Sequence, residues 1–212
     1  MLRVERLVIG ALPPLSFEVR AGECLAVEGP SGSGKTRLLR SIADLEAAPG
    51  YIVLEGIAQR EMSGPAWRHL VRFVAAEPGW WAPTLRTHFL SSSAQAKRFE
   101  RHAHALGLAP AILDAPIARL STGERLRAAL ARSLADEPKV LLLDEPTAAL
   151  DAANAALVAE LIRFQLLSGR AIVIASHDAA LIESLSHQRL QLEPPRAPAP
   201  AGEPGAASGG SP

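Results

Sequence analysis

The sequence predicts an α/β fold with a mainly parallel sheet, an antiparallel β portion near the N-terminus and a small helical subdomain. Short runs rich in β-forming residues alternate along the chain with segments whose apolar residues recur at helical spacing. The runs LLLD (141–144) and IVIAS (172–176) are continuously apolar rather than alternating. Such runs are typical of strands that are buried on both faces of a parallel sheet.

The expected elements follow in order along the chain. Strands at 15–19 and 24–29 flank the turn residue Gly22, and a helix at 35–47 follows a glycine-rich loop. The later elements are strands at 52–55 and 70–75, a mostly helical stretch at 86–136, a strand at 139–145, a helix at 152–167, a strand at 170–176 and a final helix–strand pair. No convincing strand occurs between Pro78 and Ala135, so we expect a helical subdomain at about 78–136, inserted between two strands of the sheet.

Composition limits the classes of protein that the chain can belong to. The 212 residues suit one domain with a sizeable core, and 22 Lys+Arg against 22 Asp+Glu give no global reason to expect nucleic acid as a partner. The single Cys24 cannot form an intramolecular disulfide, and we expect it to be a small core residue. We also expect no structural metal, no signal peptide and no membrane span, which predicts a cytoplasmic location.

Two stretches divide the chain into a folded unit and a tail. From Leu190 onward the sequence becomes a run of Pro, Ala, Gly and Ser without periodicity, which cannot offset the entropy of ordering it. We therefore expect one folded domain over 1–193 and a disordered tail over 194–212.

The glycine-rich loop carries a complete phosphate-binding pattern, GxxxxGK[ST], between a predicted strand and a predicted helix. Its residues, together with the one that follows, are our candidate nucleotide contacts: Gly29, Pro30, Ser31, Gly32, Ser33, Gly34, Lys35, Thr36 and Arg37. The glycines let backbone N–H groups converge on phosphate oxygens, while Lys35 reaches the β- and γ-phosphates and the Thr36 hydroxyl takes a Mg²⁺ position. The pattern predicts a nucleoside-triphosphate site on a P-loop NTPase core.

A carboxylate pair follows the buried strand at 139–145. Asp144 lies at the carboxyl end of that strand, where open α/β sheets bind ligands, so we expect it to hold Mg²⁺ through water. Glu145, one residue further on, is placed to deprotonate a water in line with the γ-phosphate. The alternative is that Glu145 only caps the next turn.

The segment Leu120-Ser121-Thr122-Gly123-Glu124 precedes a predicted helix, upstream of the buried strand. With it the sequence resembles the ATP-binding cassette (ABC) ATPases over residues 2–192, because that family carries its LSGGQ signature at this position. The family's D-loop aspartate corresponds to Asp151, and its switch histidine corresponds to His177. Without the resemblance, His177 is simply a histidine at the end of a strand.

The resemblance implies the ATP-binding and ATP-hydrolysing subunit of an ABC transporter, of the small bacterial single-cassette type. It implies a head-to-tail homodimer in which each ATP lies between one copy's phosphate loop and the other copy's Ser121 and Gly123. In that arrangement His177 binds the γ-phosphate, Asp151 couples the two sites, and a separate integral-membrane permease holds the cassettes at the inner face of the cell membrane. Two alternatives remain: a soluble ABC ATPase acting on nucleic acid or ribosomes, and a P-loop kinase.

Three positions depart from the family pattern. Ala76 stands where the Q-loop glutamine is expected, with Glu77 as a substitute, and Thr122 and Glu124 replace a glycine and the glutamine of the signature. Residues 2–14 contain no aromatic side chain to stack on adenine, so we expect loose selectivity for the base.

A pair of tryptophans and two histidines lie outside these motifs. We expect Trp80-Trp81 to form an exposed anchor for the membrane subunit, with packing inside the helical subdomain as the alternative. We expect His102 and His104 to lie on a solvated helix face.

Overall fold

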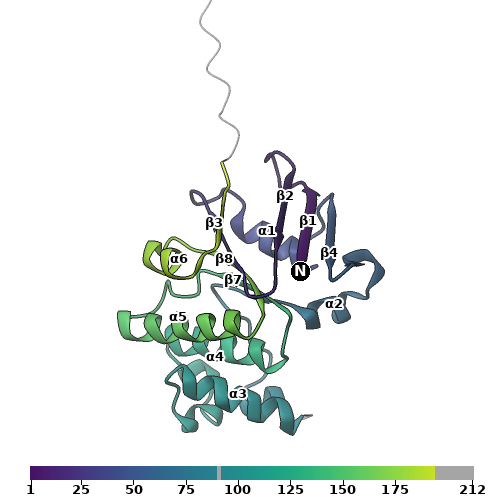
Figure 1. Ribbon diagram of the computed structural model, residues 1–212. Coiled ribbons are helices and arrows are strands. Elements are labelled where there is room, and N and C mark those ends of the chain that lie inside the picture. Colours follow the sequence, from purple (N-terminus) through teal and green to yellow (C-terminus); the bar gives the residue numbers. More distant parts are fainter. Residues whose placement is uncertain (90–91, 194–212) are drawn as a thin grey trace, which may run out of the picture.

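The computed structural model describes residues 1–89 and 92–193, which form two sheets and a set of helices (Figure 1). The strands are β1 (Leu2–Leu7), β2 (Leu15–Val19), β3 (Cys24–Glu28), β4 (Tyr51–Leu54), β5 (Ile57–Ala58), β6 (Val71–Val74), β7 (Val140–Asp144), β8 (Ala171–Ala175) and β9 (Gln188–Gln191). The α-helices are α1 (Lys35–Ile42), α2 (Gly64–Leu70), α3 (Ser93–Ala105), α4 (Thr122–Ala135), α5 (Ala152–Leu167) and α6 (Ala179–Leu185). The predicted tail at 194–212 lies outside the described residues.

The two sheets differ in direction as the sequence predicted. One is antiparallel with the order β2-β1-β4-β5, and the other is parallel with the order β6-β7-β8-β3-β9. The strands β3 and β7, which precede the two motifs, are separated in the parallel sheet only by β8. Their carboxyl ends therefore emerge at the same edge, which is where parallel sheets bind ligands.

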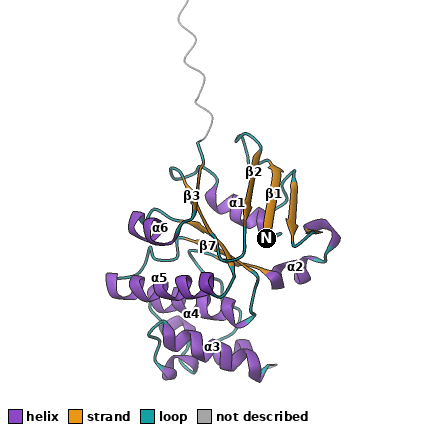
Figure 2. Cartoon of the chain, in the orientation of Figure 1, coloured by secondary structure: helices purple, strands orange, loops and turns teal. Residues whose placement is uncertain are grey.

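Burial of the parallel sheet on both faces explains the continuously apolar runs. Alternate residues of β7 enter two different cores: Leu141 and Leu143 pack with the cluster that includes α4 and α5, while Val140 and Leu142 pack with the cluster that includes α1 and β1. The helices α3, α4 and α5 lie on one side of the sheet, and α1 lies beside the antiparallel sheet (Figure 2). Cys24 is 1% exposed in β3, and burial raises the pKa of its thiol to about 12. The expectation of a core cysteine is confirmed.

Several elements differ from the sequence-based expectation, among them the short strand β5, which was not predicted. The helix expected at 35–47 ends at Ile42, because Asp44 adopts a left-handed backbone conformation with φ 58°. Strand β1 was not predicted, although its alternation of buried and exposed residues is the signal for a half-buried strand. Helix α2 was also not predicted, although its start is marked by Ser63 as N-cap and a proline in its first turn.

The helical stretch places α3 directly against α4 and corrects one expectation. His102 is only 5% exposed, whereas His104 is exposed. His102 shares its side of α3 with the buried Phe99 and Ala103, at spacings of three residues and one. Burial and the charges of Arg101 and Arg170 lower the pKa of His102 to about 4, so it is neutral at pH 7. The solvated face predicted for His102 was therefore wrong.

No helix in the described part of the chain is long and apolar enough to cross a membrane.

Candidate functional site

The phosphate loop connects β3 to α1 and leaves the start of α1 open. Gly34, the residue before α1, adopts φ 101°, and no side chain caps the helix. Gly29 adopts φ 147°, and a Cβ there would lie 2.5 Å from the carbonyl oxygen of Leu192. Only glycine fits both positions without strain. The first turn of α1 also lacks acidic residues, so its free N–H groups and the positive end of its dipole can receive an anion.

Lys35 folds back over the loop. Its Nζ donates to the carbonyl oxygens of Gly29, at 2.7 Å, and Pro30, at 3.1 Å. The same Nζ lies 3.2 Å from Nε2 of His177, which follows β8. Lys35 and His177 therefore meet. The first is the lysine expected to reach the β- and γ-phosphates, and the second is the expected switch histidine.

The two residues predicted to hold Mg²⁺ are also brought together. The Thr36 hydroxyl donates to a carboxylate oxygen of Asp144 at 2.9 Å. Asp144 is 6% exposed, and burial raises the pKa of its carboxyl above the ordinary value. Hydroxyl and carboxylate oxygens are hard ligands of the kind that Mg²⁺ prefers, and a cation here would offset the cost of burying the Asp144 charge. The residues present therefore fit a magnesium ion.

Glu145 turns out of the sheet immediately after β7. It has φ 48°, a strained conformation for a residue with a side chain, while its backbone N–H stays bonded to Ala175 at 2.8 Å. Its carboxylate accepts from the Ser176 hydroxyl and from the His177 backbone N–H, both at 3.2 Å. Nε2 of His177 lies 3.6 Å from the other carboxylate oxygen. The turn after β7 and the contacts with Ser176 and His177 therefore both hold Glu145 in place.

These side chains surround one pocket of about 630 Å³. Its lining comprises Ser31, Gly32, Gly34, Lys35, Thr36, Arg37, Asp144, Glu145, Ala148 and His177. Gly29 and Pro30 line the adjoining hollow instead, and Ser33 is buried beneath the loop with a hydroxyl that has no partner. Ala148 was not predicted. It carries no chemical signal and enters the lining only because the chain turns sharply after Glu145.

The signature segment does not line this pocket. Ser121 is exposed and caps α4, with its Oγ accepting from the N–H of Glu124 at 3.2 Å. The Glu124 carboxylate in turn accepts from the N–H and the hydroxyl of Ser121, each at 2.8 Å. These bonds lower the pKa of Glu124, which is therefore ionised at pH 7. Gly123 lies against Leu150, and a Cβ there would come within 3.0 Å of its side chain.

Asp151 likewise stays outside the phosphate pocket. It is the N-cap of α5, and its carboxylate accepts from the backbone N–H of Asn154 at 2.8 Å. This bond and a second one from the Asn154 side chain lower the pKa of Asp151. Gly123, at the start of α4, lies against Ala149 and Leu150, which lead into Asp151 and α5, and neither Gly123 nor Asp151 lines the phosphate pocket.

The wall beside the phosphate loop comes from residues 9–12. Ile9 and Leu12 pack against Gly34, and the Arg37 guanidinium lies against Gly10. Arg37 is held there by an ion pair with Glu46. No aromatic side chain occurs in residues 2–14, so an arginine and aliphatic residues form this wall.

The Q-loop position leads into a cluster around two tryptophans. Ala76 and Glu77 follow β6 and do not line the phosphate pocket. Trp81 is 75% exposed, whereas Trp80 is partly buried against the core. The Arg132 guanidinium stacks on both rings, 4.2 Å and 4.6 Å from their centroids. Sequence reasoning missed Arg132, which comes from α4 and carries no local signal.

Comparison with known proteins decides the family. The family described as "ABC transporter" matches residues 12–148. The chain belongs to the ABC transporter family. The identification of an ABC transporter ATP-binding subunit, made from the signature and the phosphate loop, is confirmed, and so is the P-loop ATPase fold.

Similar proteins within the ABC family include importers and exporters. A cytochrome c biogenesis ATP-binding export protein of Cereibacter sphaeroides is 35% identical over 92% of this chain and 87% of its own length. A hemin import ATP-binding protein of Streptomyces coelicolor is 37% identical over 83% of this chain and 68% of its own length. The chain spans only 52% of an iron(III) import ATP-binding protein of Mesorhizobium japonicum, to which it is 38% identical.

Solved structures show the same fold. A dimeric ATP-binding cassette in a post-hydrolysis state, bound to ADP and Pi, matches with a TM-score of 0.80 at 21% identity, over 91% of this chain and 94% of that one. An ATP-binding subunit of an ABC transporter matches with a TM-score of 0.81 at 24% identity, over 91% and 85% of the two chains. These likenesses establish the cassette architecture.

Proposed function

We propose that the chain works as a head-to-tail homodimer of cassettes that hydrolyses MgATP between its two copies and drives a separate membrane permease. The observation that carries the proposal is the separation of two anion-binding helix starts. Lys35, Thr36 and Glu145 line one pocket, while Ser121 and Gly123 lie outside it at the start of α4. One chain therefore supplies only half of the groups that the signature implies, and a second copy in reversed orientation supplies the rest.

The roles of the pocket residues follow from their contacts. Lys35 exchanges its bonds to the loop carbonyls for bonds to the β- and γ-phosphate oxygens of ATP, and the open N–H groups at the start of α1 hold the same phosphates. Thr36 and Asp144 would hold Mg²⁺. When bound, this ion neutralises charge on the phosphate oxygens.

Hydrolysis needs a base that faces the γ-phosphate, and Glu145 is the group placed for it. Hydrogen bonds from Ser176 and from the His177 backbone N–H fix the Glu145 carboxylate in place. The carboxylate can therefore orient a water molecule and accept a proton from it. The His177 ring, between Lys35 and Glu145, is placed to donate to the γ-phosphate. Asp151, at the start of α5, links the two halves of the dimer across the interface.

The permease contact is proposed at the tryptophan cluster, defined as Trp80, Trp81, His88 and Arg132. Trp81 offers an exposed ring, while Arg132 and His88 hold both rings in place. A rigid, exposed aromatic side chain is a typical anchor at protein interfaces. The cassette would then lie on the inner face of the cell membrane, in the cytoplasm, and no nucleic acid is expected as a partner.

The direct test is ATP turnover by the purified chain without any added acceptor. Steady release of phosphate over many turnovers supports an ATPase, whereas a requirement for a phosphate acceptor indicates a kinase. We expect Glu145→Gln to lower the steady-state rate by about 10²- to 10⁴-fold, since general-base catalysis is worth that much. Nucleotide binding should persist in this variant.

Glu18→Gln, an exposed carboxylate in β2, is the matched control and should turn over at the wild-type rate. An unchanged rate in Glu145→Gln would show that Glu145 is not the base.

A further inference from the structure

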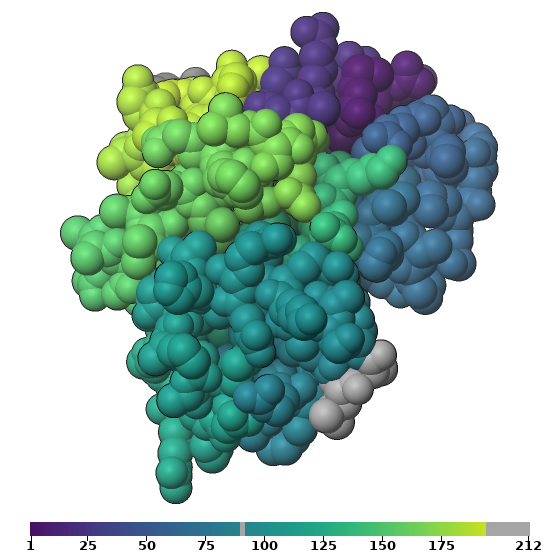
Figure 3. Space-filling view, turned by 60° about the horizontal axis from the view of Figure 1, so that its bottom comes forward, coloured from purple at the N-terminus to yellow at the C-terminus, as the bar shows by residue number. Residues whose placement is uncertain are grey.

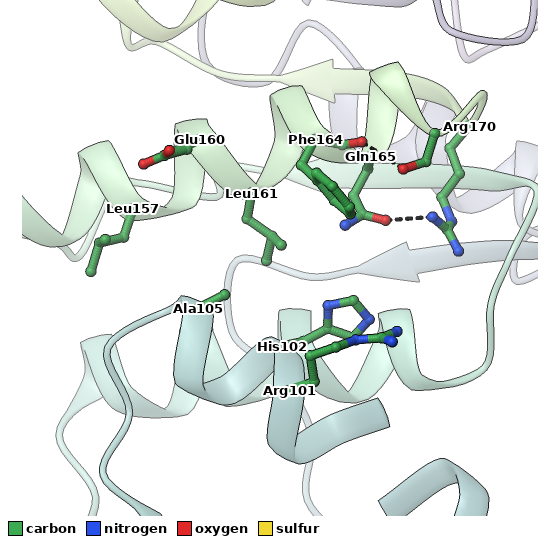
Figure 4. A pocket seen from close by; sticks show the side chains of 10 residues that line it. Arg101, His102, Ala105, Leu157, Glu160, Leu161, Phe164, Gln165 and Arg170 are labelled. Atoms are coloured by element: carbon green, nitrogen blue, oxygen red, sulfur yellow. Dashed lines mark hydrogen bonds between the residues drawn. The ribbon is translucent and has the colours of Figure 1, made fainter. Parts of the chain in front are cut away.

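A second large pocket lies between α3 and α5, away from the nucleotide site. Its volume is about 610 Å³, and none of its lining residues lines the phosphate pocket. Figure 4 shows it from close by, with α5 on one side and α3 on the other. The surfaces of these two segments adjoin on the face of the molecule shown in Figure 3. Pockets of this size hold small organic ligands.

One wall of the pocket is apolar. Leu157, Leu161 and Phe164 come from α5, and Ala105 comes from the end of α3. In Figure 4 Leu161 and the Phe164 ring point toward α3. The Phe164 side chain is 61% exposed, which is unusual for a large apolar residue beside a pocket. The wall therefore suits the apolar body of a ligand.

The inner end of the pocket carries an unused hydrogen-bond donor. Gln165 is 0% exposed, and its Oε1 accepts from the Arg170 guanidinium. The Nε2 of Gln165 is buried and has no hydrogen-bond partner among residues 1–89 and 92–193. A buried donor without a partner loses its hydrogen bonds to water and gains none in return, so an acceptor placed here would be favoured. In Figure 4 the exposed Phe164 ring lies beside this amide, so a ligand that reaches the buried nitrogen has to move the ring aside.

The charge around this donor is positive. Arg101 and Arg170 line the pocket on either side of His102, and both lower the pKa of that histidine. His102 is neutral, so it neither adds charge nor repels a cation. Two acidic groups lie nearby: Glu160 also lines the pocket, on the α5 side, and Glu137 is paired with Arg98 at 3.4 Å. Arg101 and Arg170 therefore outnumber the one carboxylate of the lining. An acceptor bound here should therefore be an anion.

We propose that this pocket binds a small amphipathic carboxylate, with its head on Gln165 and Arg101 and its tail along the α5 wall. The carboxylate accepts from the free Nε2 of Gln165 and pairs with Arg101, while an unbranched apolar chain covers Leu157, Leu161 and Phe164. Such a ligand touches both α3 and α5, and α5 begins at Asp151. Binding of this ligand requires neither a nucleotide nor a dimer of the chain.

The test is calorimetric titration of the full-length, nucleotide-free protein with sodium decanoate below its micellar concentration. We expect saturable binding with one site per chain. Arg101→Ala should weaken it about five-fold or more, because a charge-assisted contact is lost. Ala105→Trp should abolish it by filling the pocket.

The controls separate recognition from non-specific adsorption. Arg163→Ala removes an exposed arginine of α5 that does not line the pocket, and it should bind within about two-fold of the wild type. Decyltrimethylammonium has the same tail with a cationic head and should not bind. Thermal unfolding of each variant verifies that it is folded. Absence of saturable decanoate binding, equal binding of the cationic probe, or an equal loss in Arg163→Ala would overturn the proposal.

Discussion

The starts of α1 and α4 are both expected to contact phosphate, but the start of α1 is uncapped and the start of α4 is capped. At α1 the N-cap is a glycine without a side chain, the first turn carries no acid, and the N–H groups are open. At α4 the N-cap Ser121 is closed by Glu124 in a reciprocal capping box. Both helices offer a positive dipole end, but only α1 offers it freely.

The difference between α1 and α4 indicates which half of the proposed site a single chain supplies. At the α1 end Lys35 meets His177, Thr36 donates to Asp144, and His177 lies beside Glu145, all within one chain. The α4 end is occupied by its own ionised carboxylate, which a γ-phosphate must approach or displace. Binding of nucleotide to one chain and closure of the dimer should therefore respond to different substitutions.

The largest effect is expected from Ser121→Arg. A long cationic side chain at the exposed start of α4 blocks the approach of a second chain but leaves the phosphate pocket intact. Turnover should fall to background, while nucleotide affinity of the isolated chain stays within about two-fold. Ala94→Arg, at an exposed position of α3, is the control. Persistent turnover in Ser121→Arg would argue against a shared site.

A smaller effect, in the opposite direction, is expected from Glu124→Gln. Glutamine preserves the capping box but removes the negative charge that faces an incoming phosphate. Because the pKa of Glu124 is lowered, the charge is present at pH 7 and the gain should be visible there. Two like charges about 4 Å apart repel by about 1 kcal/mol in water, which corresponds to about five-fold tighter ATP-dependent dimerisation. Weaker dimerisation would mean that the carboxylate helps closure.

The smallest effect concerns the base rather than the phosphates. The wall beside the phosphate loop is formed by Ile9, Leu12 and Arg37 without an aromatic ring in residues 2–14. If no other aromatic group replaces this ring, stacking worth about 1–2 kcal/mol is lost, and we predict that GTP binds within about ten-fold of ATP. Competition titrations with the two nucleotides measure the ratio. A preference for ATP of more than ten-fold would reveal another group that recognises adenine.

The gathering of the candidate nucleotide residues around one pocket was predictable from the sequence because these residues lie in short motifs. Lys35 and Thr36 are fixed by the loop pattern, and the carboxylate pair is fixed by the buried strand before it. Contacts between distant segments were not predictable. Arg132 stacks on two tryptophans that precede it by fifty residues or more, and Glu124 closes on Ser121 by a local pattern that was read only as a departure from the signature.

His102 shows the other limit. Phe99 and Ala103 mark its side of α3 as apolar, but Arg101 and His104 beside it favoured a solvated face, and the sequence does not indicate which helix covers this side. The same packing creates the pocket between α3 and α5, which no motif announces.

The central claim is that two copies of the chain complete one another's sites. The most direct measurement is the solution mass of Glu145→Gln, by light scattering after size-exclusion chromatography, with and without saturating MgATP. We predict a monomer without nucleotide and a dimer with it, and a monomer in both conditions when Ser121→Arg is added. A chain that binds MgATP yet stays monomeric would contradict the claim.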